Sequence, residues 1–383
     1  MTEEIVDTVS PEFIQEFYGE RELRWFQIAA RNGVALALQE LHKRILIVLP
    51  TGAGKTLTIA ASLSFPDIRK ALGVDGNRQL RVLFVAHKHR LLTQAEATFV
   101  GESNVDLMLQ SMMSDVSQEY LDKGWDVCVL DEAHHEGCGT FQYHLEKLGA
   151  QPIIGLTATP DRPDGCLIKF DTIIAPITRE QAVAEGYLAP TKIHSFVDVS
   201  GKDKTAVLTD MLTSYAHEMK QTLVFVKTKK EVDAITGVLS GLGYATVGLL
   251  NQTDREMDVI LNDFSAGKIQ FIVNCNRISE GVDVQGCTGV LLGRQVGSYP
   301  MLSQIIGRAA RIDIPECNVW ELVNPLSSYN MDTTCVVGTP ESHRLVSKEG
   351  GKWIERMFNY ITHRTNKQLG IAPGKKTNRI QFT

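Results

Sequence analysis

Short apolar runs rich in β-branched residues recur along this chain, and each is followed by a polar turn and a helix-like stretch. The runs are nearly continuous rather than alternating, which is typical of parallel strands that are buried on both faces. They fall into two sets, one at residues 44–49, 81–86, 125–130 and 152–156, the other at 222–226, 245–250, 270–275, 289–292 and 318–323. Two such sets predict an α/β protein with two parallel sheets in tandem, each covered by helices on both faces.

Length and composition agree with this prediction. A chain of 383 residues can hold two or three domains, and 43% hydrophobic with 22% charged residues excludes wholesale disorder. The net charge of −6 argues weakly against a surface coated in basic charge for nucleic acid. The sheet pattern stops at residues 177–190, where Gly186 and Pro190 interrupt the chain, so we expect the domain boundary there.

The cysteines and the N-terminal residues indicate where in the cell the protein is located. The seven cysteines are dispersed and form no C-x-x-C pair, which favours reduced thiols over disulfides or a zinc site. The N-terminus is acidic and lacks the basic and apolar regions of a signal peptide. No apolar stretch approaches the ~18 residues of a transmembrane helix. We therefore expect a soluble, cytoplasmic protein without a membrane partner.

The strongest local motif follows the first apolar run and reads Pro50-Thr-Gly-Ala-Gly-Lys-Thr56. Gly52 and Gly54 let backbone N–H groups approach a phosphate chain, and the helix that follows presents its positive N-terminus. Lys55 adds a charge for the β- and γ-phosphates, and the Thr56 hydroxyl suits Mg²⁺. The motif therefore predicts a phosphate-binding loop.

Two adjacent carboxylates end the apolar run at residues 127–130. Asp131 is expected to hold Mg²⁺, while Glu132 takes a proton from the attacking water as general base. His134 follows them and could relay between the γ-phosphate and the next motif. An Asp-Glu pair alone is usually a solvated loop, but downstream of a phosphate loop it predicts a hydrolytic site.

The second half supplies basic groups for the same chemistry. The spacing of Gln304, Arg308 and Arg311 predicts that all three lie along one helix face. Arginines can neutralise the transition-state charge on a γ-phosphate, a role worth roughly 10³–10⁵ in rate. We expect Arg308 and Arg311 to act across a cleft between the two halves.

These motifs recur in a recognisable order. They read Arg24-Trp-Phe-Gln27, the loop at 50–56, Ala86-His-Lys-His-Arg-Leu-Leu-Thr-Gln94, Asp131-Glu-Ala-His134, Thr157-Ala-Thr-Pro160, Leu223-Val-Phe-Val-Lys227, Glu280-Gly-Val-Asp283 and Gln304-Ile-Ile-Gly-Arg-Ala-Ala-Arg311. The ordered set resembles superfamily 2 helicases and translocases over residues 23–311. Residues 178–190 resemble the interdomain link of the branch that holds phage and bacterial recombination-repair helicases and type III restriction motors. Trp25 and Leu49 depart from the common motifs, but neither departure removes a catalytic group.

The resemblance implies two RecA-like domains with ATP and Mg²⁺ bound in the cleft between them. Gln27 would read adenine with support from Arg24, and Thr157 and Thr159, with His134, would couple the nucleotide state to domain closure. The implied catalytic residues are Lys55, Asp131, Glu132, Gln304, Arg308 and Arg311. The implied nucleotide contacts are Arg24, Gln27, Thr51, Gly52, Ala53, Gly54, Lys55, Thr56, Gly281 and Asp283, and the Mg²⁺ ligands are Thr56 and Asp131.

The resemblance also implies a nucleic-acid partner, with DNA in single-stranded or branched form favoured. The implied contacts are His87, Lys88, His89, Arg90, Gln110, Lys227 and Arg277. The expected organisation is an N-terminal segment at 1–20, a first RecA-like domain at 21–177, a linker at 178–190, a second RecA-like domain at 191–330 and an extension at 331–383. Within the extension we predict a helix over residues 347–360. The basic tail beyond it could either grip a partner or serve as a solvated terminus.

The implied function is an ATP-hydrolysing nucleic-acid translocase, favoured as a DNA helicase or branch-remodelling enzyme. Three alternatives stay open. They are an RNA helicase, the motor subunit of a restriction system, and an ATP-switched module that binds or anneals nucleic acid without unwinding it.

Overall fold

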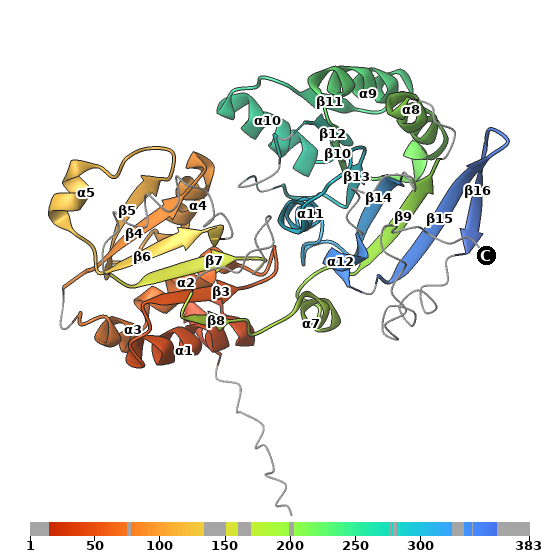
Figure 1. The fold of residues 1–383 in the computed structure, drawn as a ribbon. Helices are drawn as coiled ribbons and strands as arrows, with labels where there is room; N and C mark the ends of the chain where they lie inside the picture. Colours follow the sequence, from red (N-terminus) through yellow and green to blue (C-terminus); the bar gives the residue numbers. More distant parts are fainter. Residues whose placement is uncertain are drawn as a thin grey trace, which may run out of the picture.

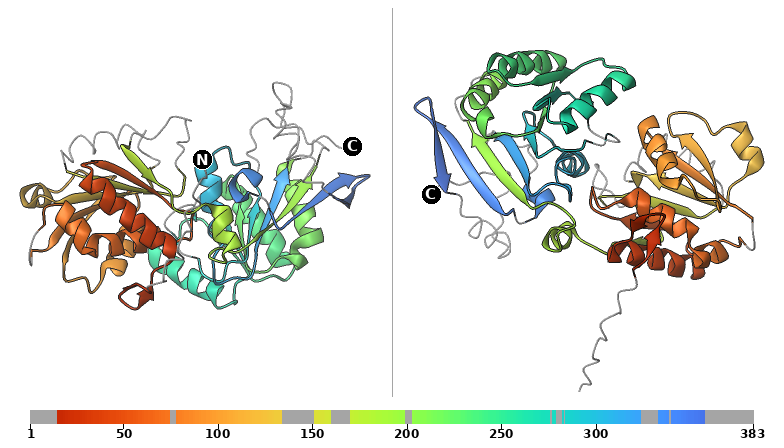
Figure 2. Two further views of the ribbon diagram at one scale, coloured as in Figure 1. Left: turned by 90° about the horizontal axis from the view of Figure 1, so that it is seen from below. Right: turned by 180° about the vertical axis from the view of Figure 1, so that it is seen from behind.

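The computed structural model describes residues 15–74, 78–133, 151–159, 170–198, 203–275, 277–278, 282, 284–323, 333–338 and 340–357. The predicted roles of His134, Gly281 and Asp283, and the basic tail, lie outside these residues. Two parallel sheets, each with its own helices, lie beside one another (Figures 1 and 2). The predicted α/β architecture is confirmed. Among the described residues, no helix combines the length and the apolar character that crossing a membrane requires.

The first sheet has six strands in the order β5-β4-β6-β7-β3-β8, and every neighbouring pair is parallel. Its strands are β3 (Arg44–Val48), β4 (Leu80–Ala86), β5 (Val105–Ser111), β6 (Val127–Asp131), β7 (Ile153–Thr157) and β8 (Thr172–Ile174). Its helices are α1 (Trp25–Gln39), α2 (Lys55–Ser64), α3 (Pro66–Ala71), α4 (His89–Phe99) and α5 (Gln118–Lys123), and a short hairpin, β1 (Phe17–Tyr18) and β2 (Arg21–Glu22), precedes them.

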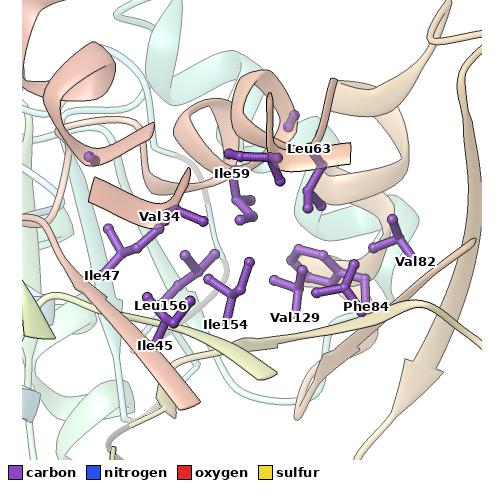
Figure 3. Packing of buried hydrophobic residues seen from close by; sticks show 14 of the residues in the cluster. Val34, Ile45, Ile47, Ile59, Leu63, Val82, Phe84, Val129, Ile154 and Leu156 are labelled. Carbon is purple, nitrogen blue, oxygen red and sulfur yellow. The ribbon is translucent and has the colours of Figure 1, made fainter. Parts of the chain in front are cut away.

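Apolar side chains from α1 and α2 meet one face of this sheet in a buried cluster (Figure 3). Val34 of α1 and Ile59 of α2 lie over Ile45, Ile154 and other strand residues. A separate cluster on the other face contains Leu83 and Cys128. Burial on both faces explains why these strands carry continuous apolar runs.

The second sheet has eight strands in the order β11-β12-β10-β13-β14-β9-β15-β16. They are β9 (Thr191–Val197), β10 (Thr222–Phe225), β11 (Thr246–Leu249), β12 (Phe271–Asn274), β13 (Gly289–Leu292), β14 (Cys317–Val323), β15 (Ser342–Glu349) and β16 (Lys352–Met357). All pairs are parallel except β15 with β16. Helices α8 (Lys204–Tyr215) and α9 (Lys229–Gly241) contribute to one core cluster. Helices α10 (Asp254–Ser265), α11 (Tyr299–Ile306) and α12 (Thr334–Val337) contribute to another.

The predicted helix over residues 347–360 is wrong, because the described part of this segment, up to Met357, lies in strands. β15 pairs with β9, and β16 returns antiparallel beside β15. Gly350 and Gly351, both with positive φ, form the two-residue turn, a combination that suits tight hairpins. The Trp353 ring contacts Phe196 edge-on at 5.4 Å between centroids, so packing against the sheet replaces the helix.

Helix α7 (Arg179–Ala184) lies between the two sheets, in the segment where the sheet pattern of the sequence stops (Figure 1). It begins at a capping box in which Thr178 and Gln181 bond reciprocally. Ala182 and Leu188 belong to the core beside the first sheet, and Ala189 belongs to a core of the second. Packing therefore anchors this segment on both sides.

Candidate nucleotide site and nucleic-acid interface

The phosphate loop connects β3 to α2. Gly52 and Gly54 have φ of 89° and 87°, a region that favours glycine, and Lys55 is the first residue of α2. Leu49, which stands at the usual first glycine, is fully buried in the core and donates its N–H to the Thr157 carbonyl at 3.0 Å. This departure therefore supports packing and leaves the glycines of the loop in place.

A cavity of about 260 Å³ lies beside the loop and is lined by Arg21, Glu22, Arg24, Gln27, Gly52, Ala53, Gly54 and Leu57. Gln27 is buried, and its Nε2 donates to the Ala53 carbonyl at 3.2 Å while its Oε1 accepts from the Arg24 N–H at 2.9 Å. The Arg24 guanidinium lies 5.4 Å from the Tyr187 ring centroid, and its partial burial lowers its pKa. Gln27 thus fixes the loop against α1 while lining the cavity.

Asp131 ends β6 beside the loop, and Glu132 follows it. Glu132 Oε1 lies 3.8 Å from Lys55 Nζ, and Glu132 has a φ of 51°, which is unusual outside glycine. The Glu132 N–H donates to Asp131 Oδ1 at 3.0 Å. Burial and the neighbouring Glu132 charge together raise the pKa of Asp131 to about 6, although the Lys55 charge lowers it. A buried carboxylate of this kind favours a nearby cation.

Several buried polar atoms around the loop have no hydrogen-bond partner within the described residues: Thr51 Oγ1, Thr159 Oγ1 and Gln304 Nε2. Thr157 Oγ1, by contrast, donates to the Thr159 carbonyl at 2.7 Å. Buried polar groups are rarely left unbonded, so orphaned atoms from both halves of the chain are consistent with a polar ligand between them.

The two halves touch at the phosphate loop. A Cβ on Gly307 would lie 2.3 Å from Thr51 Cγ2, so only glycine allows this approach. A Cβ on Gly52 would lie 3.5 Å from the Ala310 carbonyl oxygen. The segment after α11 is therefore in contact with the loop that would hold the phosphates.

The prediction that Gln304, Arg308 and Arg311 share one helix face is wrong. Helix α11 ends at Ile306, so Gln304 lies in the helix while both arginines follow it. Arg308 Nη1 donates to the Val282 carbonyl at 2.7 Å, and Arg311 Nε lies 3.4 Å from Asp313 Oδ1. Gly307, at the end of the helix, is also the residue that approaches Thr51.

The predicted nucleic-acid contacts are distributed over both halves. Lys88 caps α4 and His89 begins it, with His89 exposed and His87 half-buried. In the second half, Lys227 and Arg277 are exposed, and Arg277 Nη2 donates to the Gln252 carbonyl. These cations follow the carboxyl ends of β4, β10 and β12 respectively, where ligands of parallel sheets usually bind.

Gln110 differs from its prediction as a nucleic-acid contact. Its side chain is buried, and its Nε2 lies within 2.7–3.2 Å of the carbonyls of Ser111, Ser114 and Asp115. The Gln110 amide therefore holds the loop after β5 together.

Arg90 forms an ion pair that the sequence did not indicate. Its Nη2 lies 2.6 Å from Asp258 Oδ1, so the ion pair joins α4, beside the first sheet, to α10, beside the second. Asp258 lies on the exposed face of an amphipathic helix, so no local pattern distinguishes it from other surface acids. The Asp258 carboxylate therefore lies against a guanidinium that the sequence predicts to contact a nucleic-acid phosphate.

Because Asp258 competes with phosphate for Arg90, the Asp258→Asn variant should bind nucleic acid more tightly in the absence of ATP. An exposed ion pair contributes up to about 1 kcal/mol, so the dissociation constant should fall about two- to five-fold. Fluorescence anisotropy with a labelled oligonucleotide measures it. Asp254→Asn removes a charge from the same helix and should change the constant less; equal effects of both variants would contradict specific competition.

Comparison with known proteins agrees with this geometry. The family described as "Type III restriction enzyme, res subunit" matches residues 20–109 and 101–162, and the "Helicase conserved C-terminal domain" family matches residues 203–313. The chain therefore resembles superfamily 2 helicases and translocases, in the branch of the type III restriction motors. The two sheets have the fold of tandem RecA-like domains, as the sequence predicts.

Curated relatives of this chain include IRC3 of Saccharomyces cerevisiae, assigned as an ATP-dependent helicase. The two are 23% identical, and the match covers 78% of this chain and 51% of IRC3. The chain thus spans about half the length of this curated relative.

Two solved structures share the fold. A fragment assigned to the HsdR subunit of a type I restriction enzyme from Vibrio vulnificus matches with a TM-score of 0.66 and 20% identity, covering 86% of this chain and 70% of that one. The type ISP restriction-modification enzyme LlaBIII, bound to DNA, matches with a TM-score of 0.65 and 14% identity, covering 87% of this chain and 32% of that one.

Proposed function

We propose that this chain is an ATP-hydrolysing nucleic-acid translocase. The observation that carries the proposal is the pairing of Lys55 with Glu132 at 3.8 Å beside a glycine loop that also touches Gly307 of the second domain. A phosphate loop, a general base and an arginine-bearing segment from the other domain are the parts that ATP hydrolysis between two RecA-like domains requires.

Each group has a role in this proposal. Lys55 holds the β- and γ-phosphates, and Glu132 accepts the proton of the attacking water. Thr56 and Asp131 would hold Mg²⁺, and the buried carboxylate of Asp131 suits that cation. When bound, Mg²⁺ would neutralise charge on the phosphate oxygens. Arg308 or Arg311 would stabilise the charge that develops on the γ-phosphate.

Coupling to movement follows from the position of the site. Because Thr51 and Gly307 meet across the domains, the γ-phosphate and its loss can change how closely the domains approach. Thr159 Oγ1 and Gln304 Nε2 have no hydrogen-bond partner among the residues that the structure describes, so each can form a different hydrogen bond in the two domain arrangements. A ligand shifts such an equilibrium only through its different affinities for the two arrangements.

We further propose DNA as the track. LlaBIII, which shares the fold, is described as bound to DNA, and the matched HsdR fragment is assigned to a type I restriction enzyme. An RNA helicase, a restriction motor that acts with a partner subunit, and an ATP-switched annealing module are the alternatives.

For the domain boundaries, we propose a first domain at 21–177, a linker at 178–190 and a second domain from 191. Because β15 pairs with β9 and β16 with β15, we extend the second domain from residue 330 to Met357. The N-terminal segment at 1–20 and the tail complete the chain.

The proposal is tested by measuring ATPase activity with single-stranded DNA, duplex DNA, forks, four-way junctions and single-stranded RNA at several salt concentrations. Strong stimulation by a DNA structure supports a DNA translocase. Stimulation by RNA alone would support the RNA helicase alternative, and absence of stimulation by every nucleic acid would contradict the proposal.

A further inference from the structure

Two neighbouring strands of the second sheet, β10 and β13, place cationic residues side by side at their carboxyl ends. Phe225 at the end of β10 is in register with Asn274 of β12 and Leu292 of β13. Lys227 and Arg294 each follow their strand by two residues and therefore lie along the same edge. Cys275, which follows β12, joins the end of that strand to the residues after β10, since its Sγ donates to the Lys227 carbonyl at 3.1 Å.

Lys204, the first residue of α8, adds a third cation to this edge. It is half-buried, and its ammonium makes no hydrogen bond or ion pair with any part of the chain that the structure describes. Burial has the largest effect and lowers the pKa of Lys204. The charge of Glu231 raises this pKa, and the charges of Lys227 and Arg294 lower it. The packing places α8 at this edge, because a Cβ on Gly293, the residue before Arg294, would lie 2.9 Å from Leu208 Cδ2 and 3.1 Å from the Phe225 carbonyl oxygen.

Glu231 is the acid that faces this group, but its carboxylate serves the local backbone. Glu231 Oε2 accepts the N–H groups of Lys227 at 2.6 Å and Thr228 at 3.1 Å, as the capping box of α9. Lysines elsewhere have direct partners, such as Lys268 with Asp263 at 2.8 Å and Lys192 with Glu316 at 2.6 Å. Like charges gathered at the ligand-binding edge of a parallel sheet favour an anion there.

We propose that Lys204 and Arg294 form, together with Lys227, a binding site for the phosphate backbone of the nucleic-acid strand on the second domain. The site would contact phosphates and no bases, so it would position the strand without reading its sequence. Sequence reasoning selected Lys227 alone, because Lys204 and Arg294 lie outside the motifs and reach the site only through the strand order β12-β10-β13-β14-β9. This inference rests on the proposed function.

The salt dependence of binding tests the site directly. Loss of one phosphate contact should reduce the slope of log affinity against log salt by about 0.7 for a single strand. We therefore expect Lys204→Gln to bind fluorescein-labelled oligodeoxythymidine about five-fold more weakly at about 0.1 M salt, with the smaller slope. Arg294→Gln should lower the slope similarly, and Lys204→Arg, which keeps the charge, should restore the wild-type slope.

Lys268→Gln is the matched control, because Lys268 lies before β12 at the opposite edge of the same sheet and is paired with Asp263. Its slope should equal that of the wild type. An unchanged slope in Lys204→Gln would overturn the site while leaving the proposed function intact. A wild-type protein that binds neither DNA nor RNA would instead overturn the proposed function.

Discussion

Replacing Glu132 by glutamine should abolish nucleic-acid-stimulated ATP hydrolysis while leaving ATP binding close to that of the wild type. The amide keeps the shape of the side chain but cannot accept a proton, and general-base catalysis contributes about 10²–10⁴-fold. Steady-state hydrolysis at saturating nucleic acid and titration with a fluorescent ATP analogue measure the two properties. Glu119→Gln, an exposed change on α5, should alter neither.

Lys55→Ala separates the roles of the ion-paired residues. Lys55 lies 3.8 Å from Glu132, and in the proposed mechanism it holds the phosphates of ATP. Its loss should therefore weaken ATP binding as well as hydrolysis. If Glu132→Gln retained near-normal turnover, the assignment of Glu132 as the base would be wrong.

Arg308→Ala should have the second large effect, a fall in hydrolysis of about 10³-fold or more with ATP binding largely spared. The guanidinium now donates to the Val282 carbonyl, and the residue follows the Gly307 turn that touches the phosphate loop. We expect it to reach the γ-phosphate when the domains close. Single-turnover hydrolysis and analogue binding, measured with Arg255→Ala of α10 as the control, test this expectation.

The comparison with Arg311→Ala decides between the two arginines. If Arg308 is the arginine that stabilises the charge on the γ-phosphate, removing Arg311 should reduce hydrolysis less than removing Arg308, because Arg311 lies near Asp313. Equal loss of ATP binding and hydrolysis in Arg308→Ala would contradict this role of Arg308, because the residue would then contribute to ground-state binding.

The central strands could be predicted from the sequence because burial on both faces leaves a continuous apolar run. β3, β4 and β10 are examples, and their boundaries differ from the prediction by one residue. β5 and β8 at the edges of the first sheet carry partly exposed residues and lack such a run. β9 was missed because polar residues face other polar groups within the sheet: Ser195 Oγ donates to Glu321 Oε1 at 2.6 Å and lies 2.8 Å from His343 Nε2.

The candidate site could be predicted where residues adjacent in the sequence act together, as in the phosphate loop and at Asp131 and Glu132. Features that depend on contacts between distant segments could not be. Examples are the approach of Gly307 to Thr51, the approach of Gly52 to Ala310, and the pairing of Arg90 with Asp258. None of these leaves a local pattern.

Directional movement is the central claim, and displacement of a third strand from a DNA triplex measures it without requiring unwinding of the duplex. The wild-type protein should displace the strand only with ATP and Mg²⁺, and Glu132→Gln should bind the same DNA without displacing it. ATP hydrolysis stimulated by this DNA with no displacement of the third strand would contradict translocation and favour an ATP-switched binding module.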